Sequence, residues 1–383
     1  MGQLGRFVMM IAVILLTFSS TLRADVLDDL VNRAPNSWAA VKIGEARAGN
    51  PDAQYVVGRG LVDGSWVGLE TKMGLEWLRR AADNGQPNAS FTLARLYELG
   101  QYGIPIDIDQ AEYWYERSFN AGMSYAARKL ALLNESKSPP DIEKALSWSR
   151  KGAEAGDFEC QLELGGFYGS GFRLRLDYSQ SLYWYLRAMA HDVASSSQYA
   201  DRAQAVLGAY YENGLGTARS MTDALQWYRV AARNGNTDAN YALGKIYESG
   251  EGVAPNQDEA MDYFVAAAER DHQLAQYRLG LGFANGTGVA ADRVQAIKWL
   301  TLASRRCCEL TKGEVEQLRL HRVESLLSWR VEPRDVQNTL EDSMKVARAE
   351  LNRIKHLSTA DEIKAGETQA RDFNPVRPPL PIP

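Results

Sequence analysis

The sequence has few of the residues on which disulfide frameworks, metal sites and nucleic-acid interfaces depend. Its 383 residues include three cysteines and four histidines, too few for a disulfide scaffold and without a pair at metal-ligand spacing. Acidic residues outnumber basic ones, 48 against 43, which gives a formal net charge of −5. The strongly basic face that a phosphate backbone requires is therefore not expected. We predict no metal, no cofactor and no nucleic-acid partner.

Motifs typical of enzymes are also missing. The chain has no Gly-x-Ser-x-Gly turn, and its Gly-x-Gly turns lack the Lys-Ser/Thr continuation of a phosphate-binding loop. The acidic residues are scattered along predicted helices and show no distinctive pairing around a cleft, which a glycoside hydrolase would need. The sequence therefore predicts that the protein is not an enzyme.

Long apolar runs are absent except for one near the amino terminus. This run extends from Phe7 to Phe18, follows Arg6 and leads through a Ser/Thr stretch to Ala24. Because it is shorter than the ~20 residues of a spanning helix, we interpret residues 1–24 as a secretory signal peptide. Its removal takes away two arginines and no acid, so the formal charge becomes −7. We expect cleavage after Ala24 and a periplasmic or secreted protein, without stable membrane insertion.

Two points about this segment stay open. Leu22 is larger than the small residue preferred three positions before a cleavage site, so the exact bond is undecided. The alternative to a cleaved signal is an uncleaved anchor that lies in the membrane interface.

Two series of residues recur along the chain with a period near 36. The first begins with a small anchor residue, followed by Leu or Val at +4, a small residue at +5 and an aromatic or apolar residue at +8. The second is an aromatic residue 22 to 25 positions after each anchor. The anchors are Ala53, Ala89, Ala126, Cys160, Ala203, Ala239 and Ala275, and the aromatics are Trp77, Trp114, Trp148, Trp184, Trp227, Tyr263 and Trp299. Two series in phase over seven copies indicate tandem structural repeats.

Each repeat has the pattern of two helices joined by a turn. In the copy that begins at Ala239, helical spacing ends at the Gly250-Glu-Gly252 turn, where glycine tolerates a left-handed backbone. A second helix is predicted from about Asn256, which can cap its amino terminus. The small residues Ala239 and Gly244 allow the helices to approach closely. A single hairpin cannot bury both apolar faces, so neighbouring hairpins must stack into an α-solenoid.

These copies resemble the Sel1-like repeat family, relatives of the tetratricopeptide repeat. The pattern is carried by Ala239-Leu243-Gly244-Tyr247, Gly250-Glu-Gly252-Val253 and Ala260-Tyr263-Phe264, and it recurs in the copy from Ala203. The resemblance covers about residues 53–310. It implies an all-α fold, a right-handed α-solenoid of about seven helix-hairpin repeats with a helical C-terminal cap.

We divide the chain into five segments on this basis. They are a signal peptide (1–24), an N-terminal capping half-repeat (25–52), seven repeats (53–310, starting at 53, 89, 126, 160, 203, 239 and 275), C-terminal capping helices (311–357) and a flexible Pro-rich tail (358–383). Helical spacing predicts the terminal helices at 314–329 and 334–354. Seven extra residues precede Ala203, and they lengthen a helix or form a loop. The state of Cys307 and Cys308, as a redox pair, a tether or a packed residue beside a free one, is also undecided.

We expect the repeated tryptophans to lie in the core, since aromatic residues at helical spacing usually pack against neighbouring helices. Cys160, in place of an anchor alanine, should be a small buried hydrophobe. Trp66 falls outside this phase and is a candidate for ligand contact. By analogy with tetratricopeptide geometry, positions +2, +6 and +9 should line a concave wall that binds a partner. Those residues are Tyr55, Arg59, Phe91, Arg95, Glu98, Glu212, Tyr241, Lys245, Glu248 and Tyr277.

The resemblance implies a non-enzymatic scaffold or adaptor in the bacterial envelope that binds one or more proteins on this concave surface. An ordinary solvated face is the alternative for the wall residues. The alternative function is a cell-wall or glycan-binding protein with weak hydrolase activity. The sequence names neither the partner nor its pathway, and it leaves the oligomeric state and the role of the Pro-rich tail open.

Overall fold

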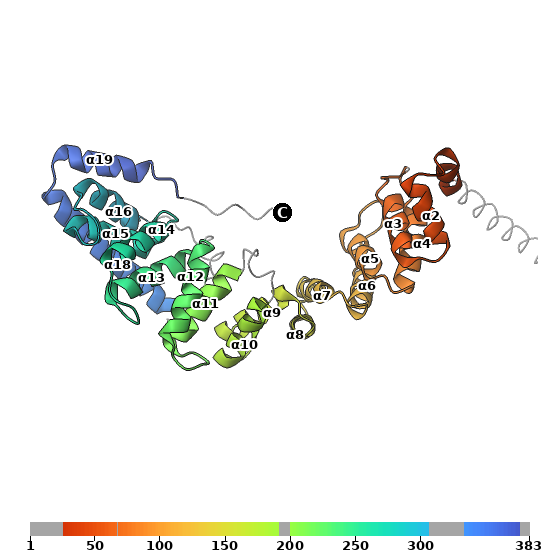
Figure 1. Cartoon of the computed structure of the whole chain (residues 1–383), viewed down its shortest axis with the longest axis horizontal. Helices are drawn as coiled ribbons and strands as arrows, with labels where there is room; N and C mark the ends of the chain where they lie inside the picture. Colours follow the sequence, from red (N-terminus) through yellow and green to blue (C-terminus); the bar gives the residue numbers. More distant parts are fainter. Residues whose placement is uncertain (1–25, 67, 191–199, 306–332, 376–383) are drawn as a thin grey trace, which may run out of the picture. The chain divides into compact units, whose positions relative to one another are not determined.

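The computed structural model describes residues 26–66, 68–190, 200–305 and 333–375 (Figure 1). All regular structure in these ranges is helical, which confirms the all-α fold class. None of the helices in the same ranges is long and apolar enough to span a membrane. The predicted signal peptide, the extra residues before Ala203, the 314–329 helix, the adjacent cysteines and the end of the Pro-rich segment lie outside the described residues.

The chain divides into two compact units, residues 1–160 and 161–383. The helices of the first unit are α2 (Trp38–Arg47), α3 (Pro51–Val62), α4 (Thr71–Asp83), α5 (Pro87–Leu99), α6 (Ile108–Asn120), α7 (Tyr125–Glu135) and α8 (Ile142–Glu154). A helix α9 (Phe158–Ser170) begins at the end of this unit and continues into the second. The second unit contains α10 (Tyr178–Met189), α11 (Ala200–Asn213), α12 (Met221–Arg233), α13 (Thr237–Ser249), α14 (Gln257–Ala268), α15 (Gln273–Asn285), α16 (Arg293–Arg305), α18 (Pro333–His356) and α19 (Ala360–Arg371).

Helices that are consecutive in sequence pack against one another within each unit. In the first unit α3 packs on α4, α5 on α6 and α7 on α8, while α4 and α6 also contact the helix that follows. Residues such as Leu78, Leu93, Tyr115 and Leu130 form a core that runs through these repeats. The same order of contacts joins α11 to α16 in the second unit. Stacked helical hairpins of this kind make an α-solenoid.

In five of the seven hairpins, a glycine at +5 faces the residue directly after the repeated aromatic. In the copy from Ala239, a Cβ atom added to Gly244 would lie 2.5 Å from the Phe264 ring. The same contact, at 2.6 to 2.8 Å, joins the pairs Gly58–Leu78, Gly165–Tyr185, Gly208–Tyr228 and Gly280–Leu300. No real Cβ fits at such distances, so glycine allows the two helices of the hairpin to approach.

The helix boundaries follow the signals expected from the sequence. Asn256 caps α14 by accepting a hydrogen bond from the Glu259 backbone amide, and Gly250 ends α13 with a φ of 76°. Cys160 is fully buried, as predicted for a residue in an anchor position. Five of the six tryptophans of the repeated series are buried, with Trp227 half-buried. Their role as core residues is thus confirmed except for the partial exposure of Trp227.

The third repeat lacks a Gly-x-Gly turn, and an ion-pair cluster lies beside this turn. Lys137 lies 2.9 Å from the Glu112 carboxylate, and Lys144 and Asn134 also donate hydrogen bonds to it. Burial by itself raises the pKa of Glu112, but these hydrogen bonds outweigh it and lower the value to about 2. The cluster therefore joins α6, α7 and the start of α8 through a charged carboxylate.

Two terminal helices cover the last repeat. The predicted helix at 334–354 is confirmed as α18, which buries Met344, Ala347, Leu351 and Ile354. The prediction that 358–383 is flexible throughout was wrong, because α19 occupies its first half and packs on α16. Thr359 and Glu362 form a capping box that starts this helix. The prolines of this segment all follow Phe373, so they do not prevent a helix from forming before that residue.

Candidate functional site

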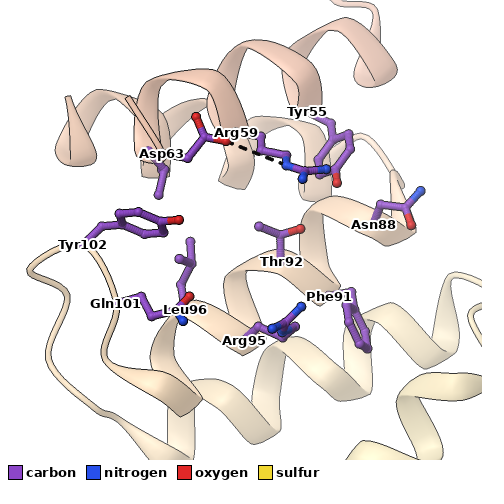
Figure 2. A pocket seen from close by; sticks show the side chains of 11 residues that line it. Tyr55, Arg59, Asp63, Asn88, Phe91, Thr92, Arg95, Leu96, Gln101 and Tyr102 are labelled. Carbon is purple, nitrogen blue, oxygen red and sulfur yellow. Dashed lines mark ion pairs between the residues drawn. The ribbon is translucent and has the colours of Figure 1, made fainter. Parts of the chain in front are cut away.

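A pocket lies between α3 and α5, the first helices of the first two repeats (Figure 2). Its volume is about 330 Å³. Side chains from both helices and from the loop after α5 line it, namely Tyr55, Arg59, Val62, Asp63, Asn88, Phe91, Thr92, Arg95, Leu96, Gln101 and Tyr102. The pocket thus brings together four of the predicted wall residues, two from each repeat.

The repeat geometry places equivalent side chains on both sides of this pocket. Tyr55 and Phe91 occupy position +2 of the two repeats, and Arg59 and Arg95 occupy position +6. Because +2 and +6 are four residues apart, each pair lies on one face of its helix. Each repeat therefore contributes an aromatic ring and a guanidinium group to the pocket.

Hydrogen bonds join the start of α3 to the turn that leads into α5. Asn84 donates to the Gln54 side-chain oxygen at 2.9 Å, and Gln86 donates to Asp52 at 3.2 Å. Gln86 also caps α5 by accepting from the Ala89 backbone amide. These contacts within the first unit thus help to set the spacing of the pocket walls.

The charge of the lining is positive. Arg59 and Arg95 are exposed, and Asp63 is the acidic residue among the lining side chains. Its carboxylate lies 4.0 Å from Arg59 Nε and also accepts a hydrogen bond of 2.9 Å from the Ser65 backbone amide. The pocket can therefore interact favourably with an anionic group, although the chain as a whole has a net negative charge.

The sequence interpretation missed Tyr102 at the rim. The second repeat, at 37 residues, is one residue longer than the common period of 36, and its turn reads Gly100-Gln-Tyr-Gly103 where the four later copies, from Cys160 on, read Gly-x-Gly. The extra residue forms a tight turn in which Tyr102 has a φ of 55° and Gly103 one of 77°. The ring of Tyr102 extends from this turn toward Asp63 (Figure 2). The spacing of 37 instead of 36 was the signal that could have identified this position.

The other aromatic and cationic wall residues lie in the second unit. Tyr241 stacks on His272, with ring centroids 4.6 Å apart, and the Lys245 ammonium group lies 5.8 Å from the Tyr241 ring. Burial raises the pKa of Tyr241. Tyr277 packs at the edge of the cluster that contains Leu351 of α18. None of these residues lines the pocket of the first unit.

The predicted glutamates at +9 are engaged within their own unit. Glu212 accepts a hydrogen bond of 2.6 Å from the Tyr228 hydroxyl, and Tyr115 donates in the same way to Glu98. Burial and then this bond to Glu98 raise the pKa of Tyr115. Where Phe264 replaces the tyrosine, Glu248 instead lies 3.3 Å from Arg278. These carboxylates therefore join helices, and they are not free to receive a ligand in the way the arginines are.

Trp66, the remaining candidate, lies outside the pocket. It is half-buried against Gly60, where an added Cβ would lie 2.6 Å from its ring, and it meets Trp38 edge to face at 5.6 Å. Trp38 itself is exposed. Among the described residues, no group of three or more His, Cys, Asp or Glu side chains is arranged to hold a metal ion.

Comparison with known proteins identifies the repeats. The model of the Sel1 repeat matches residues 51–86, 87–123, 124–157, 158–192, 201–236, 237–272 and 273–306. The Sel1-repeat-containing protein YjcO of Escherichia coli K12 is 26% identical over 198 residues, which cover 50% of this chain and 81% of that protein. Chitin synthase regulator SKT5 of Saccharomyces cerevisiae is 29% identical over 203 residues, or 49% of this chain and 28% of the regulator.

A solved structure has the same fold over most of the chain. It is a protective antigen of uropathogenic Escherichia coli described as displaying an SLR fold, with a TM-score of 0.50, 24% identity and coverage of 91% of this chain and 82% of the antigen. The matched repeats occupy well over half of the sequence, at the period and register that the anchor residues define. The chain therefore belongs to the Sel1 repeat family.

Proposed function

We propose that this protein is a non-enzymatic scaffold of the bacterial envelope that binds a partner protein at the pocket between α3 and α5. Sel1 repeat proteins typically mediate protein–protein interactions and are generally not enzymes. Two fungal relatives bear the names of a chitin synthase regulatory factor and a chitin synthase regulator. The chain matches less than a third of the length of each, so the likeness concerns the repeats.

One observation carries this proposal. Aromatic and arginine side chains project from equivalent positions of adjacent repeats into a single pocket, and both arginines are exposed. Aromatic residues and arginine are the types that most often dominate binding at protein interfaces. A partner that inserts a segment between the two helices would contact both repeats at once.

Affinity capture with the mature chain, residues 25–383, tests this function. We compare the unmodified protein, the double variant Arg59→Glu/Arg95→Glu and the control Arg150→Glu, which reverses an exposed charge on α8 outside the pocket. The double variant should lose a partner that both other proteins retain. Capture of the same set of proteins by all three would contradict the proposal.

The envelope location has a separate test. The protein should be recovered from the periplasm or the medium with an amino terminus at Asp25, detected by mass spectrometry of its first peptide. Recovery in the cytoplasm with Met1 intact would contradict the location without affecting the proposed interaction.

A further inference from the structure

We propose that the pocket between α3 and α5 binds a carboxylate of an extended peptide, received between Arg59 and Arg95, with apolar side chains of that peptide on either side of the carboxylate packing against Tyr102 at one end of the pocket and Phe91 at the other (Figure 2). The inference rests on the proposed function and names the chemistry of the partner segment. It follows from the arginines, from the acidic residue at the end of α3 and from the turn that presents Tyr102.

Both guanidinium groups have donors available to a ligand. Among the described residues, Arg95 has no ion-pair partner, and the one carboxylate near Arg59 lies at 4.0 Å from its Nε, longer than a hydrogen bond. A guanidinium carries five N–H donors in a planar fork whose geometry matches the two oxygens of a carboxylate. Both guanidinium groups are therefore available to a carboxylate that enters between α3 and α5.

The charge of the pocket favours a carboxylate over a phosphate. Two arginines and Asp63 give the lining a formal charge of +1, which a monovalent carboxylate neutralises. A phosphoryl group carries a charge between about −1.5 and −2 at neutral pH, so it would leave the pocket with a net negative charge and would be repelled by Asp63 more strongly than a carboxylate is. The backbone amide of Ser65 holds Asp63 in place at 2.9 Å, so this repulsion is built into the site.

The turn that carries Tyr102 supplies the second part of the argument. A tyrosine with positive φ is disfavoured by roughly 1–2 kcal/mol relative to a right-handed residue, and such strain tends to persist where a side chain has a function. The inserted residue that creates this turn also places the ring on the pocket rim. Tyr102 follows the end of α5 and Phe91 lies near its start, so the two rings offer apolar surface at the two ends of the pocket (Figure 2).

Fluorescence anisotropy with the mature chain and four matched probes tests the inference. All probes are labelled short peptides of the same leucine-rich sequence. The first has one aspartate and an amidated carboxyl end, and the second has asparagine instead and a free carboxyl end. The third has asparagine and the amide, and the fourth has phosphoserine and the amide. We expect the first or the second probe to bind at least about tenfold more tightly than the third, since hydrogen bonds to charged groups are strong.

The probes also distinguish the sources of the carboxylate. Preference for the first probe assigns a side-chain carboxylate, and preference for the second assigns a chain terminus. Equal affinity for the first three probes, or tighter binding of the phosphoserine probe, would overturn the inference.

Variants locate the binding to this pocket. Arg59→Ala and Arg95→Ala should each lower the affinity for the preferred probe about tenfold. Added salt should lower the affinity of the unmodified protein for the same probe. The control Arg150→Ala should bind like the unmodified chain. Tyr102→Asn, which suits positive φ, should fold at least as stably yet bind more weakly. Binding that survives both arginine variants would overturn the assignment.

This test separates the ligand chemistry from the proposed function. If charge reversal at Arg59 and Arg95 abolishes partner capture but no carboxylate probe binds, the scaffold function stands and the carboxylate assignment fails. If the probes bind as expected but partner capture is unchanged, the pocket has this ligand chemistry and the partner binds elsewhere.

Discussion

The close approach of the two helices in each hairpin makes a sharp prediction for Gly244→Ala. The added methyl group would lie 2.5 Å from the Phe264 ring, which is itself fully buried, so ring and helix must move apart. Overpacking of a well-packed core costs about 1–3 kcal/mol. Alanine offsets up to about 1 kcal/mol of this through its better helix propensity. We expect the free energy of unfolding to fall by about 1–2 kcal/mol.

A second glycine in a helix provides the matched control. Gly44 of α2 is exposed, and no heavy atom lies within 4 Å of an added Cβ. Gly44→Ala should therefore raise the free energy of unfolding by about 0.5–1 kcal/mol. Both changes add one methyl group within a helix, so their opposite signs isolate the effect of helix approach.

Urea titration followed by far-ultraviolet circular dichroism measures both variants. The transition midpoint should shift down for Gly244→Ala and up for Gly44→Ala, with similar slopes because the surface exposed on unfolding is nearly unchanged. A midpoint for Gly244→Ala at or above that of the unmodified chain would refute the claim that the hairpins close at position +5.

Three other predictions concern single polar interactions. Tyr228→Phe removes the hydroxyl that donates to Glu212 and should lower the free energy of unfolding by about 1 kcal/mol, measured by urea titration. Because the pKa of Glu112 is lowered to about 2, its stabilising contribution is present above pH 4.5 and is lost as the pH falls toward 2. Glu112→Gln should lower the free energy of unfolding at pH 7 and reduce its dependence on pH between 4.5 and 2. If the free energies of unfolding of the two proteins fell equally over this pH range, the prediction would be contradicted. Thr359→Ala breaks the capping box of α19 and should lower the stability of this helix by about 0.5–2 kcal/mol. Hydrogen-exchange mass spectrometry should then show faster exchange of its backbone amides.

The repeat architecture could be predicted from sequence because packing imposes it at every copy. A small residue at +5 and a large one after the tryptophan are two halves of one contact, as in Gly208 and Tyr228. Such a contact leaves a periodic trace, and its recurrence along the chain fixes the register of both helices. The capping residue Asn256 was predictable for the same reason, since its hydrogen bond depends on local sequence.

The pocket was only half predictable, because part of it departs from the repeat. Arg59 and Arg95 were found by assuming that equivalent positions face one direction. Tyr102 and Asp63 come from the turns, where a one-residue insertion or a local hydrogen bond decides the direction of the side chain. The +9 glutamates were assigned to the same wall, although the tyrosines that engage them depend on contacts between helices.

Site-specific photo-crosslinking tests the central claim most directly. A photoreactive amino acid replaces Asn88, an exposed residue on the pocket lining, or Arg150 on α8 as the control. On irradiation in the intact cell, position 88 should crosslink to one protein, and mass spectrometry should locate the crosslink next to a carboxylate of that protein. Position 150 should give no such product. Crosslinking of the same protein from position 150 alone, with none from position 88, would contradict the account.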